Sequence, residues 1–293
     1  MIGGFLNILK PPGMSSHDVI GTARRILGVK RIGHAGTLDP AAAGVLPVAV
    51  GQAARLLEYL ALARKSYRAE ILFGRATDTG DDTGTIVKEN LTAELPEKEA
   101  VTAVLTHFVG EIEQTLPAYS AVKIDGKRAY DLTRKGKEIE LPKRRTKIFS
   151  LTMQDYRKSS ILIDVTCHKG TYIRSLAESI GEHLGIPSTM GFLLRTQVGD
   201  FSLSDAMTIE ELAKKREAAL LSPEKFLGHL PRYALEPKRE KAFLNGLPTN
   251  DRKYSGTGLH VVYAEEHFLG IGTFSREEVA IRPVKVFREE ERR

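Results

Sequence analysis

Residues 31–56 read RIGHAGTLDPAAAGVLPVAVGQAARL and place a single carboxylate, Asp39, just ahead of an apolar run. Pro40 disfavours the helical region at Asp39, and Gly33 and Gly36 allow positive φ or the close approach of another group. The pattern predicts that Asp39 sits on a shaped loop rather than inside a helix. Two interpretations remain open at this point, because an aspartate before proline is also ordinary turn chemistry.

Working outward from this loop, the apolar spacing along the chain predicts both strands and helices. The predicted strands cover residues 4–10, 45–50, 65–74, 150–157 and 159–170, and then 258–266, 267–275 and 279–287. The predicted helices cover residues 16–28, which Ser16 can cap, and 52–63, 96–110 and 171–185, the last opening directly after Gly170. Because the elements arrive in mixed order without a βαβ repeat, an α+β fold around an antiparallel or mixed sheet is expected.

The composition of the 293 residues, 42% hydrophobic and 27% charged, is that of an ordinary soluble globular protein. The single cysteine, Cys167, excludes an internal disulfide framework and any cysteine-based zinc site. The longest apolar stretch falls short of the roughly 20 residues that a membrane span needs, and the first residues lack the basic region of a secretory signal. We therefore expect a cytoplasmic protein with no membrane partner.

The formal net charge of +6 is concentrated in one segment. Residues 115–150 hold ten Lys or Arg against four Asp or Glu, and they also carry Tyr119, Tyr130 and Phe149. Cations interleaved with aromatic rings suit a nucleic-acid backbone and its bases. A solvated basic surface with no partner is the alternative.

The segment GRATDTGDDTG (74–84) resembles a calcium-binding loop only loosely. Gly80 and Thr83 stand where such a loop has an acid and a glycine. No metal site is predicted here or elsewhere in the chain.

Several segments together resemble the TruB family of tRNA pseudouridine synthases. They are LNILKPPGMSSHDV, RIGHAGTLDPAAAGVLPVAVGQAARL, KSYRAEILFGRATDTGDDTG, PAYSAVKIDGKRAYDLTRKG, CHKGTYIRSLAESIG and FLLRTQVGDF, in the family's order. The resemblance implies a pseudouridine synthase fold over residues 1–232, with a central mixed, largely antiparallel sheet flanked by helices. Residues 237–293 weakly resemble the PUA RNA-binding module, a small β-barrel.

The activity that the resemblance implies is isomerisation of uridine-55 in the T-loop of tRNA to pseudouridine. That reaction breaks the bond from ribose C1′ to uracil N1 and rejoins the base through C5, so it needs a carboxylate acting as nucleophile or base at the sugar. It needs neither a metal nor an organic cofactor. The implied partner is the T-arm of tRNA, and we expect a monomer with no protein partner.

The resemblance also implies roles for individual residues. Asp39 matches the catalytic carboxylate, Tyr67 the tyrosine that stacks on the target base and can take the C5 proton, and Arg174 the arginine that pairs with the aspartate. Tyr172 matches a residue lining the same pocket, and Leu194 the apolar wall under the base.

The remaining matches concern RNA contact. His34 matches the wedge that fills the space of a flipped base, and Lys10 a lysine near the site that supports its structure. Within the basic segment, Arg144, Arg145 and Lys147 are expected to contact the tRNA backbone.

Two other classes of protein compete with this interpretation. A non-catalytic tRNA-binding or RNA-folding module would use the basic segment and the C-terminal barrel, but would not need Asp39, Tyr67 and Arg174 in their motifs. A glycoside hydrolase needs two acids flanking the bond, and the motifs offer one.

Overall fold

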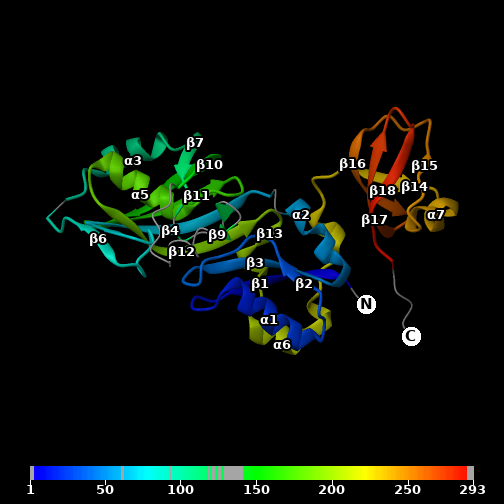
Figure 1. The fold of residues 1–293 in the computed structure, drawn as a ribbon, viewed down its shortest axis with the longest axis horizontal. Coiled ribbons are helices and arrows are strands. Elements are labelled where there is room, and N and C mark those ends of the chain that lie inside the picture. Colours follow the sequence, from blue (N-terminus) through cyan, green and yellow to red (C-terminus); the bar gives the residue numbers. More distant parts are fainter. Residues whose placement is uncertain are drawn as a thin grey trace.

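The computed structural model describes residues 3–60, 63–92, 94–117, 119, 123–124, 127–128 and 141–288. A large sheet forms the body of the molecule and a smaller sheet forms its C-terminal end (Figure 1). Tyr130 and residues 129–140 of the predicted basic segment lie outside the described residues.

Nine strands of the described residues form the large sheet. In spatial order they are β1 (Gly4–Lys10), β3 (Ala43–Val50), β12 (Ser188–Val198), β4 (Lys65–Phe73), β11 (Ser160–Cys167), β10 (Lys143–Tyr156) and β7 (Gly110–Thr115), with β2 (Ile32–His34) beside β3 and β13 (Phe201–Ser202) beside β12. The β12–β3 pair is parallel and the other pairs are antiparallel. The predicted α+β class with a mixed, largely antiparallel sheet is confirmed.

The strands β3 and β12 meet where the chain needs a glycine. Gly44 has φ +116°, and a Cβ at this position would collide with the backbone of Arg195 on β12. The glycine therefore permits the parallel contact that joins the two halves of the sheet.

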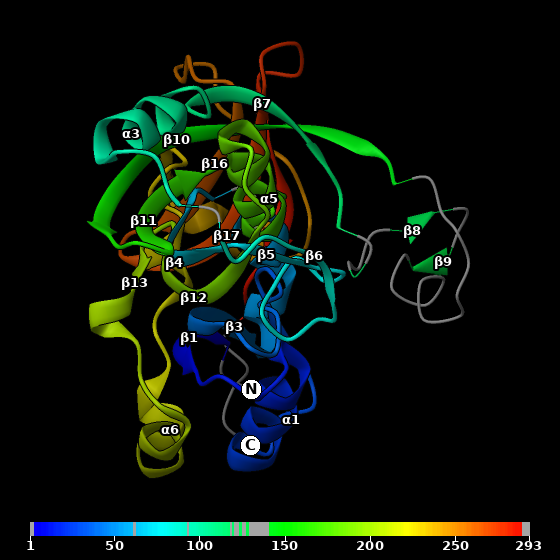
Figure 2. The ribbon, with the colours of Figure 1, turned by 90° about the vertical axis from the view of Figure 1, so that its left-hand side faces the viewer.

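Helices cover the two halves separately (Figure 2). α3 (Lys98–Thr106) and α5 (Ile173–Leu184) pack on the half made of β4, β11 and β10, where their apolar residues share one core with those strands. α1 (Ser16–Leu27) and α6 (Ile209–Lys215) pack at the β1–β3 end.

The start of α1 differs from the prediction by one residue. Ser15, not Ser16, is the N-cap: its hydroxyl accepts from the Asp18 N–H at 3.1 Å, and Asp18 Oδ2 accepts from the Ser15 N–H at 2.9 Å. Ser16 is the first helical residue and is buried. Gly28 ends the helix at φ +67°, as the sequence predicts.

The predicted helix over 52–63 is shorter and irregular. A 3₁₀ turn, η1 (Gly51–Leu56), leads into α2 (Leu57–Leu60), and residues 61–62 lie outside the described residues. The remaining elements are two small hairpins, β5 (Arg75–Thr77) with β6 (Ile86–Glu89) and β8 (Lys123–Ile124) with β9 (Lys127–Arg128), and the 3₁₀ turns η2 (Leu203–Asp205), η3 (Arg216–Ala219), η4 (Pro223–Phe226) and η5 (Pro237–Arg239).

The C-terminal region forms a second sheet beside α7 (Glu240–Leu244). In the described residues its order is β14 (Arg232–Leu235), β16 (Gly258–Ala264), β17 (His267–Ser275), β18 (Ala280–Val286) and β15 (Thr249–Asn250). The three predicted strands are present, but β14 and β15 are the edges of an open sheet and not neighbours in a closed barrel.

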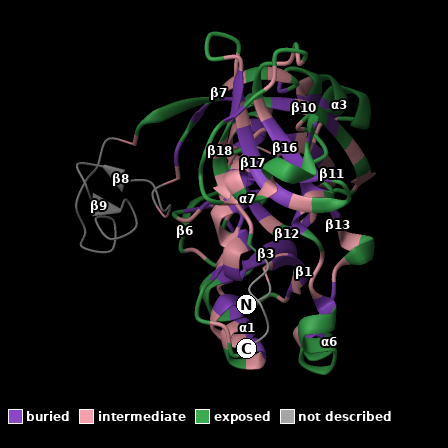
Figure 3. Cartoon of the chain, turned by 90° about the vertical axis from the view of Figure 1, so that its right-hand side faces the viewer, coloured by how far each residue is buried: buried purple, intermediate pink, exposed green. Residues whose placement is uncertain are grey.

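This sheet packs against the body. Val261, Tyr263 and Ile271 share an apolar cluster with residues of β1 and β3, and Lys285 Nζ lies 3.0 Å from Glu58 Oε1. Buried residues lie mainly along the strands of both sheets, while exposed residues gather on α3 and α6 (Figure 3). None of the helices within the described residues is long and apolar enough to cross a membrane.

Candidate active site

Residues 36–40, the GTLDP loop, are fixed through their backbone. Gly36 begins the loop at φ +87°. Each of the five backbone carbonyls of the loop accepts a hydrogen bond. The Arg195 side chain donates to the carbonyls of Gly36 and Thr37, and the Ser16 hydroxyl donates to that of Leu38. The Ala42 N–H donates to the Asp39 carbonyl, and Lys10 and the Gly13 N–H both donate to the Pro40 carbonyl. The loop is therefore held by groups from three other parts of the chain, and Asp39 keeps its carboxylate for other contacts.

Arg195 is the main support of this loop, and the sequence analysis did not single it out. Its side chain is fully buried, with Nε donating to the Val45 carbonyl at 2.7 Å and Nη2 to the Gly36 carbonyl at 3.1 Å. Nη1 approaches the Thr37 carbonyl at 3.5 Å. Arg195 lies in the quoted segment FLLRTQVGDF, but its role depends on a strand register that the sequence does not reveal.

Asp39 and Arg174 form an ion pair, with Arg174 Nε 3.1 Å from Asp39 Oδ2. The other two guanidinium nitrogens donate to backbone carbonyls, Nη1 to Thr79 at 2.8 Å and Nη2 to Tyr119 at 3.0 Å. The Arg174 side chain is 5% exposed and that of Asp39 is 39% exposed. A buried, fully used arginine thus holds a carboxylate that remains accessible to a substrate.

The first turn of α5 places Arg174 and is held from β7. The helix begins at Ile173 rather than directly after Gly170, with Tyr172 as its N-cap. The buried Gln114 side chain accepts from the Tyr172 N–H and donates to the Tyr172 carbonyl, both at 3.1 Å. Gln114 is a second supporting residue that the sequence analysis missed, because only the fold brings β7 to this helix.

Tyr67 lies on the face of β4 that packs towards α5, in the same apolar cluster as Leu38. Burial raises the pKa of its hydroxyl above the ordinary value, while the nearby Arg195 charge acts in the opposite direction and the Asp39 charge adds to the increase. The phenol is therefore neutral at physiological pH. The structure brings Asp39, Tyr67 and Arg174 together.

Leu194 does not share this face. Its cross-strand partner on β4 is Arg68, whereas the partners of Leu193 and Arg195 are Ala69 and Tyr67. Because side chains alternate along a strand, Leu194 lies on the opposite side of the sheet from Tyr67. Leu193, and not Leu194, is buried in the apolar cluster that contains Tyr67.

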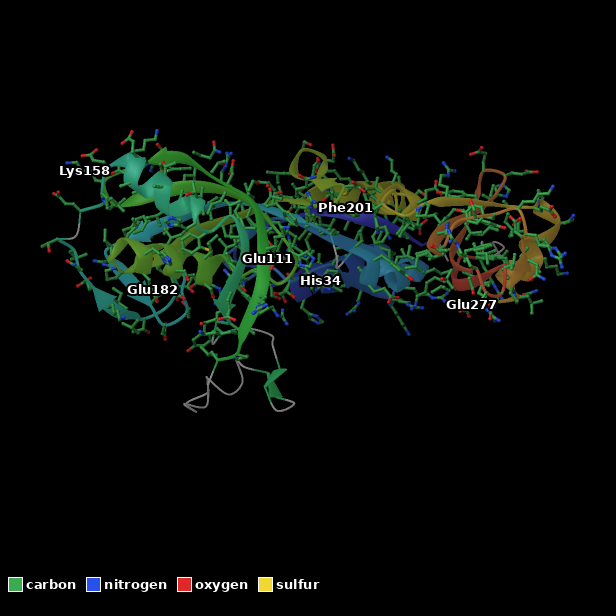
Figure 4. All side chains as sticks on the ribbon, turned by 90° about the horizontal axis from the view of Figure 1, so that it is seen from above. His34, Glu111, Lys158, Glu182, Phe201 and Glu277 are labelled. Carbon is green, nitrogen blue, oxygen red and sulfur yellow. The ribbon has the colours of Figure 1, made fainter. Side chains whose placement is uncertain are left out.

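His34 lies at the end of β2, near the middle of the molecule's long axis (Figure 4). Its Nδ1 is buried and has no hydrogen-bond partner among the described residues. Burial, with a smaller contribution from the Arg195 charge, lowers the pKa of the imidazole, so the ring is neutral at physiological pH.

Two lysines lie close to the GTLDP loop. Lys10 donates to the carbonyls of Pro11, Met14 and Pro40, and burial lowers its pKa to about 8 against the attraction of Asp39. The Lys65 side chain packs against Gly36, where a Cβ would lie 3.1 Å from Lys65 Cε. Burial, together with the Arg195 charge, lowers the pKa of Lys65 to about 8.

The three cations singled out in the basic segment do not form one surface. Arg144 on β10 lies opposite Gln114 on β7. Its guanidinium packs against Gly170, where a Cβ would lie 2.8 Å from Arg144 Nη1. Arg145 and Lys147 point to the other side of β10, opposite Glu113 and Glu111. Both glutamates lie just before the basic segment 115–150.

The acidic turn after β5 is organised by its own side chains. Asp81 Oδ1 accepts from the hydroxyls of Thr79 and Thr83 and from the Thr83 N–H. Among the described residues, no group of three or more His, Cys, Asp or Glu side chains could hold a metal ion.

Comparison with known proteins gives matches along most of the chain. Residues 24–173 match the model of the TruB family pseudouridylate synthase N-terminal domain, and residues 174–230 match that of the tRNA pseudouridylate synthase B C-terminal domain. A tRNA pseudouridine synthase B from Symbiobacterium thermophilum is 49% identical over 84% of this chain and 83% of its own length. One from Alkaliphilus oremlandii is 42% identical over 98% of each chain.

Solved structures agree with the sequence matches. An H/ACA RNP bound to a substrate RNA containing 2′-deoxyuridine contains a chain with a TM-score of 0.74 and 25% identity, covering 98% of this chain and 86% of its own. A chain of a Cbf5-Nop10-Gar1 complex has a TM-score of 0.72 and 26% sequence identity, and the match covers 98% of this chain and 84% of that one. Because the two family models together cover residues 24–230, including the GTLDP loop, this chain belongs to the TruB family of pseudouridylate synthases.

Proposed function

We propose that this protein converts uridine-55 in the T-loop of tRNA to pseudouridine. The observation that carries the proposal is the Asp39–Arg174 ion pair, in which a buried arginine holds an accessible carboxylate on a braced loop beside Tyr67. The names of the relatives supply the substrate class, tRNA.

In the proposed reaction Asp39 acts at the ribose, as the nucleophile at C1′ or as the base at C2′. The C1′–N1 bond breaks, the uracil turns within the pocket, and a C1′–C5 bond forms. C5 then loses its proton and N1 carries one, so the product is an isomer and no co-reactant is consumed. Arg174 holds the reacting carboxylate in place through the contact between its Nε and Asp39 Oδ2.

Tyr67 and Leu193 are the proposed walls of the base pocket. The buried Tyr67 ring can stack on the uracil, and Leu193 presents an apolar surface from the adjacent strand. Because burial raises the pKa of the Tyr67 phenol, little of the phenolate, its basic form, is present at neutral pH. We assign two roles to Tyr67, stacking on the uracil and transfer of the C5 proton, and the second requires a shift of its pKa when the substrate binds.

His34 is proposed to occupy the space that the flipped uridine leaves in the T-loop. A neutral imidazole can stack in that space at modest cost. Lys10 is proposed to support the loop through the Pro40 carbonyl.

Phosphate contact is proposed for Arg144, Arg145 and Lys147 on β10, and residues 237–293 are proposed to be a PUA-like RNA-binding unit. The division of the chain at residues 232–237 belongs to this proposal. We further propose that the enzyme acts in the cytoplasm as a monomer without a cofactor.

The experiment is to incubate the purified protein with an unmodified tRNA transcript and map pseudouridine at single-nucleotide resolution. We expect modification at position 55 and none in a transcript with cytidine at that position. Binding of the transcript without any pseudouridine would favour the non-catalytic RNA-binding module instead.

A further inference from the structure

The backbone of Leu38, the residue before Asp39, is held by one buried side chain. The Ser16 hydroxyl accepts from the Leu38 N–H at 2.9 Å and donates to the Leu38 carbonyl at 3.2 Å. Ser16 is 2% exposed and Leu38 is 3% exposed. A single hydroxyl from the first turn of α1 therefore satisfies both backbone groups of Leu38.

These two hydrogen bonds have no substitute within the described residues, where neither Leu38 group has another partner. Elsewhere the loop has separate supports, with Arg195 at Gly36 and Lys10 at Pro40. Loss of the Ser16 hydroxyl would leave a buried donor and a buried acceptor unpaired at the residue adjoining Asp39, which is costly to keep in place.

We propose that Ser16 is a positioning residue for Asp39, acting through the backbone of Leu38. The inference rests on the proposed function, because it takes the Asp39 carboxylate to be the reacting group. Ser16 itself touches no reacting atom. Its hydroxyl fixes the peptide groups on either side of Leu38, and this sets where the Asp39 Cα stands relative to Arg174.

The expected consequence is kinetic. A carboxylate displaced by about 1 Å from the reacting carbon can lose up to a hundredfold in rate while the surrounding binding surface stays intact. Removal of the Ser16 hydroxyl should therefore reduce the rate of the chemical step and leave RNA affinity unchanged.

The neighbouring serine provides a matched control. Ser15 caps the same helix through Asp18, and both its side chain and that of Asp18 are on the exposed side of the turn. Ser15→Ala should lower the melting temperature by loss of the cap, without touching Leu38. A purely structural role for Ser16 would make Ser16→Ala behave in the same way.

The experiment measures single-turnover pseudouridine formation on unmodified tRNA with saturating enzyme, tRNA affinity by filter binding, and the melting temperature. The proteins are wild type, Ser15→Ala, Ser16→Ala and Ser16→Cys. The cysteine variant fills the same space but offers only a weak donor and acceptor, so it keeps the test open if the alanine variant does not fold.

We expect both Ser16 variants to be slower than wild type by about tenfold or more, with affinities within about threefold, and Ser15→Ala to react at the wild-type rate. A folded Ser16 variant that reacts as fast as Ser15→Ala, beside an active wild type, would overturn this inference alone. A wild-type protein that forms no pseudouridine would overturn the proposed function and the inference with it.

Discussion

Arg174 holds Asp39 through Nε alone, at 3.1 Å, because its other two nitrogens are committed to the carbonyls of Thr79 and Tyr119. The contact therefore differs from a forked arginine–carboxylate pair, in which two nitrogens meet two oxygens. It makes Arg174 a junction between the GTLDP loop, the turn after β5 and the segment after β7.

Replacement of Arg174 should separate its charge from its geometry. Lysine keeps the charge but cannot supply three donors in one plane. We expect Arg174→Lys to bind tRNA with nearly unchanged affinity and to slow single-turnover isomerisation by tenfold or more, about 1.4 kcal/mol of transition-state stabilisation. Arg174→Ala should be slower still. A salt-dependent loss of affinity with a normal single-turnover rate would instead identify Arg174 as a phosphate contact.

Tyr67→Phe tests the two roles of the tyrosine. The ring remains available for stacking, so binding should stay within about threefold of wild type. Isomerisation should fall sharply if the hydroxyl takes part in the reaction, and this is the outcome we expect. Tyr67→Leu, which removes the ring as well, should lose affinity in addition to rate. A fully active phenylalanine variant would leave Tyr67 with stacking alone.

The cations of β10 should contribute to binding rather than to chemistry. Neutralising Arg145 and Lys147 together should reduce the slope of log affinity against log salt by up to about two units, similarly for different tRNAs. The control is Lys158→Gln in the turn that follows β10, which should leave the slope unchanged (Figure 4). A slope unaffected by the double substitution would mean that the phosphates lie elsewhere.

Lys65 should destabilise the fold at neutral pH. Its pKa is about 8 in the folded protein, below the ordinary value of 10.5, so the unfolded chain holds the proton more tightly. The resulting cost is fully present below pH 8 and disappears as the pH rises from 8 to 10.5. Lys65→Met, of similar size and without charge, should raise the free energy of unfolding at pH 7 by roughly 1–3 kcal/mol.

The measurement for Lys65 is urea denaturation of both proteins at pH 7 and pH 10. The difference between variant and wild type should shrink at the higher pH. An equal difference at the two pH values would show that Lys65 carries no such cost.

Much of the fold could be predicted from the sequence, because the spacing of apolar residues and the positions of glycine and proline determine local structure. The alternation in β4, the glycine at the end of α1 and the apolar run of β3 all lie where the sequence predicted them. The small C-terminal β-barrel is not confirmed, since strand spacing does not say which edges pair, and β14 joins an open sheet as a parallel edge beside β16.

In the site, too, some residues could be identified from local sequence, whereas others depend on tertiary structure. Asp39, Tyr67 and Arg174 lie in motifs that could be matched locally, and the fold brings them together. Leu194 lies on the face of the sheet away from Tyr67, which the motif alone could not reveal, because a one-residue slip along a strand reverses the face of every side chain. Arg195 and Gln114 could not be found, because their contacts depend on tertiary neighbours.

The serines at the start of α1 illustrate why local rules can leave a choice open. Ser15 and Ser16 are both able to cap a helix. Tertiary structure decides between them, because a buried backbone at Leu38 needs the hydroxyl of Ser16 and leaves Ser15 to cap.

The most direct test of the account is single-turnover isomerisation by Asp39→Asn at saturating protein, compared with wild type on the same unmodified tRNA. Asparagine has nearly the same shape as aspartate but no basic or nucleophilic carboxylate oxygen at neutral pH. We predict unchanged tRNA affinity and no detectable pseudouridine at position 55. A rate within tenfold of wild type would contradict the assignment of Asp39 as the reacting carboxylate.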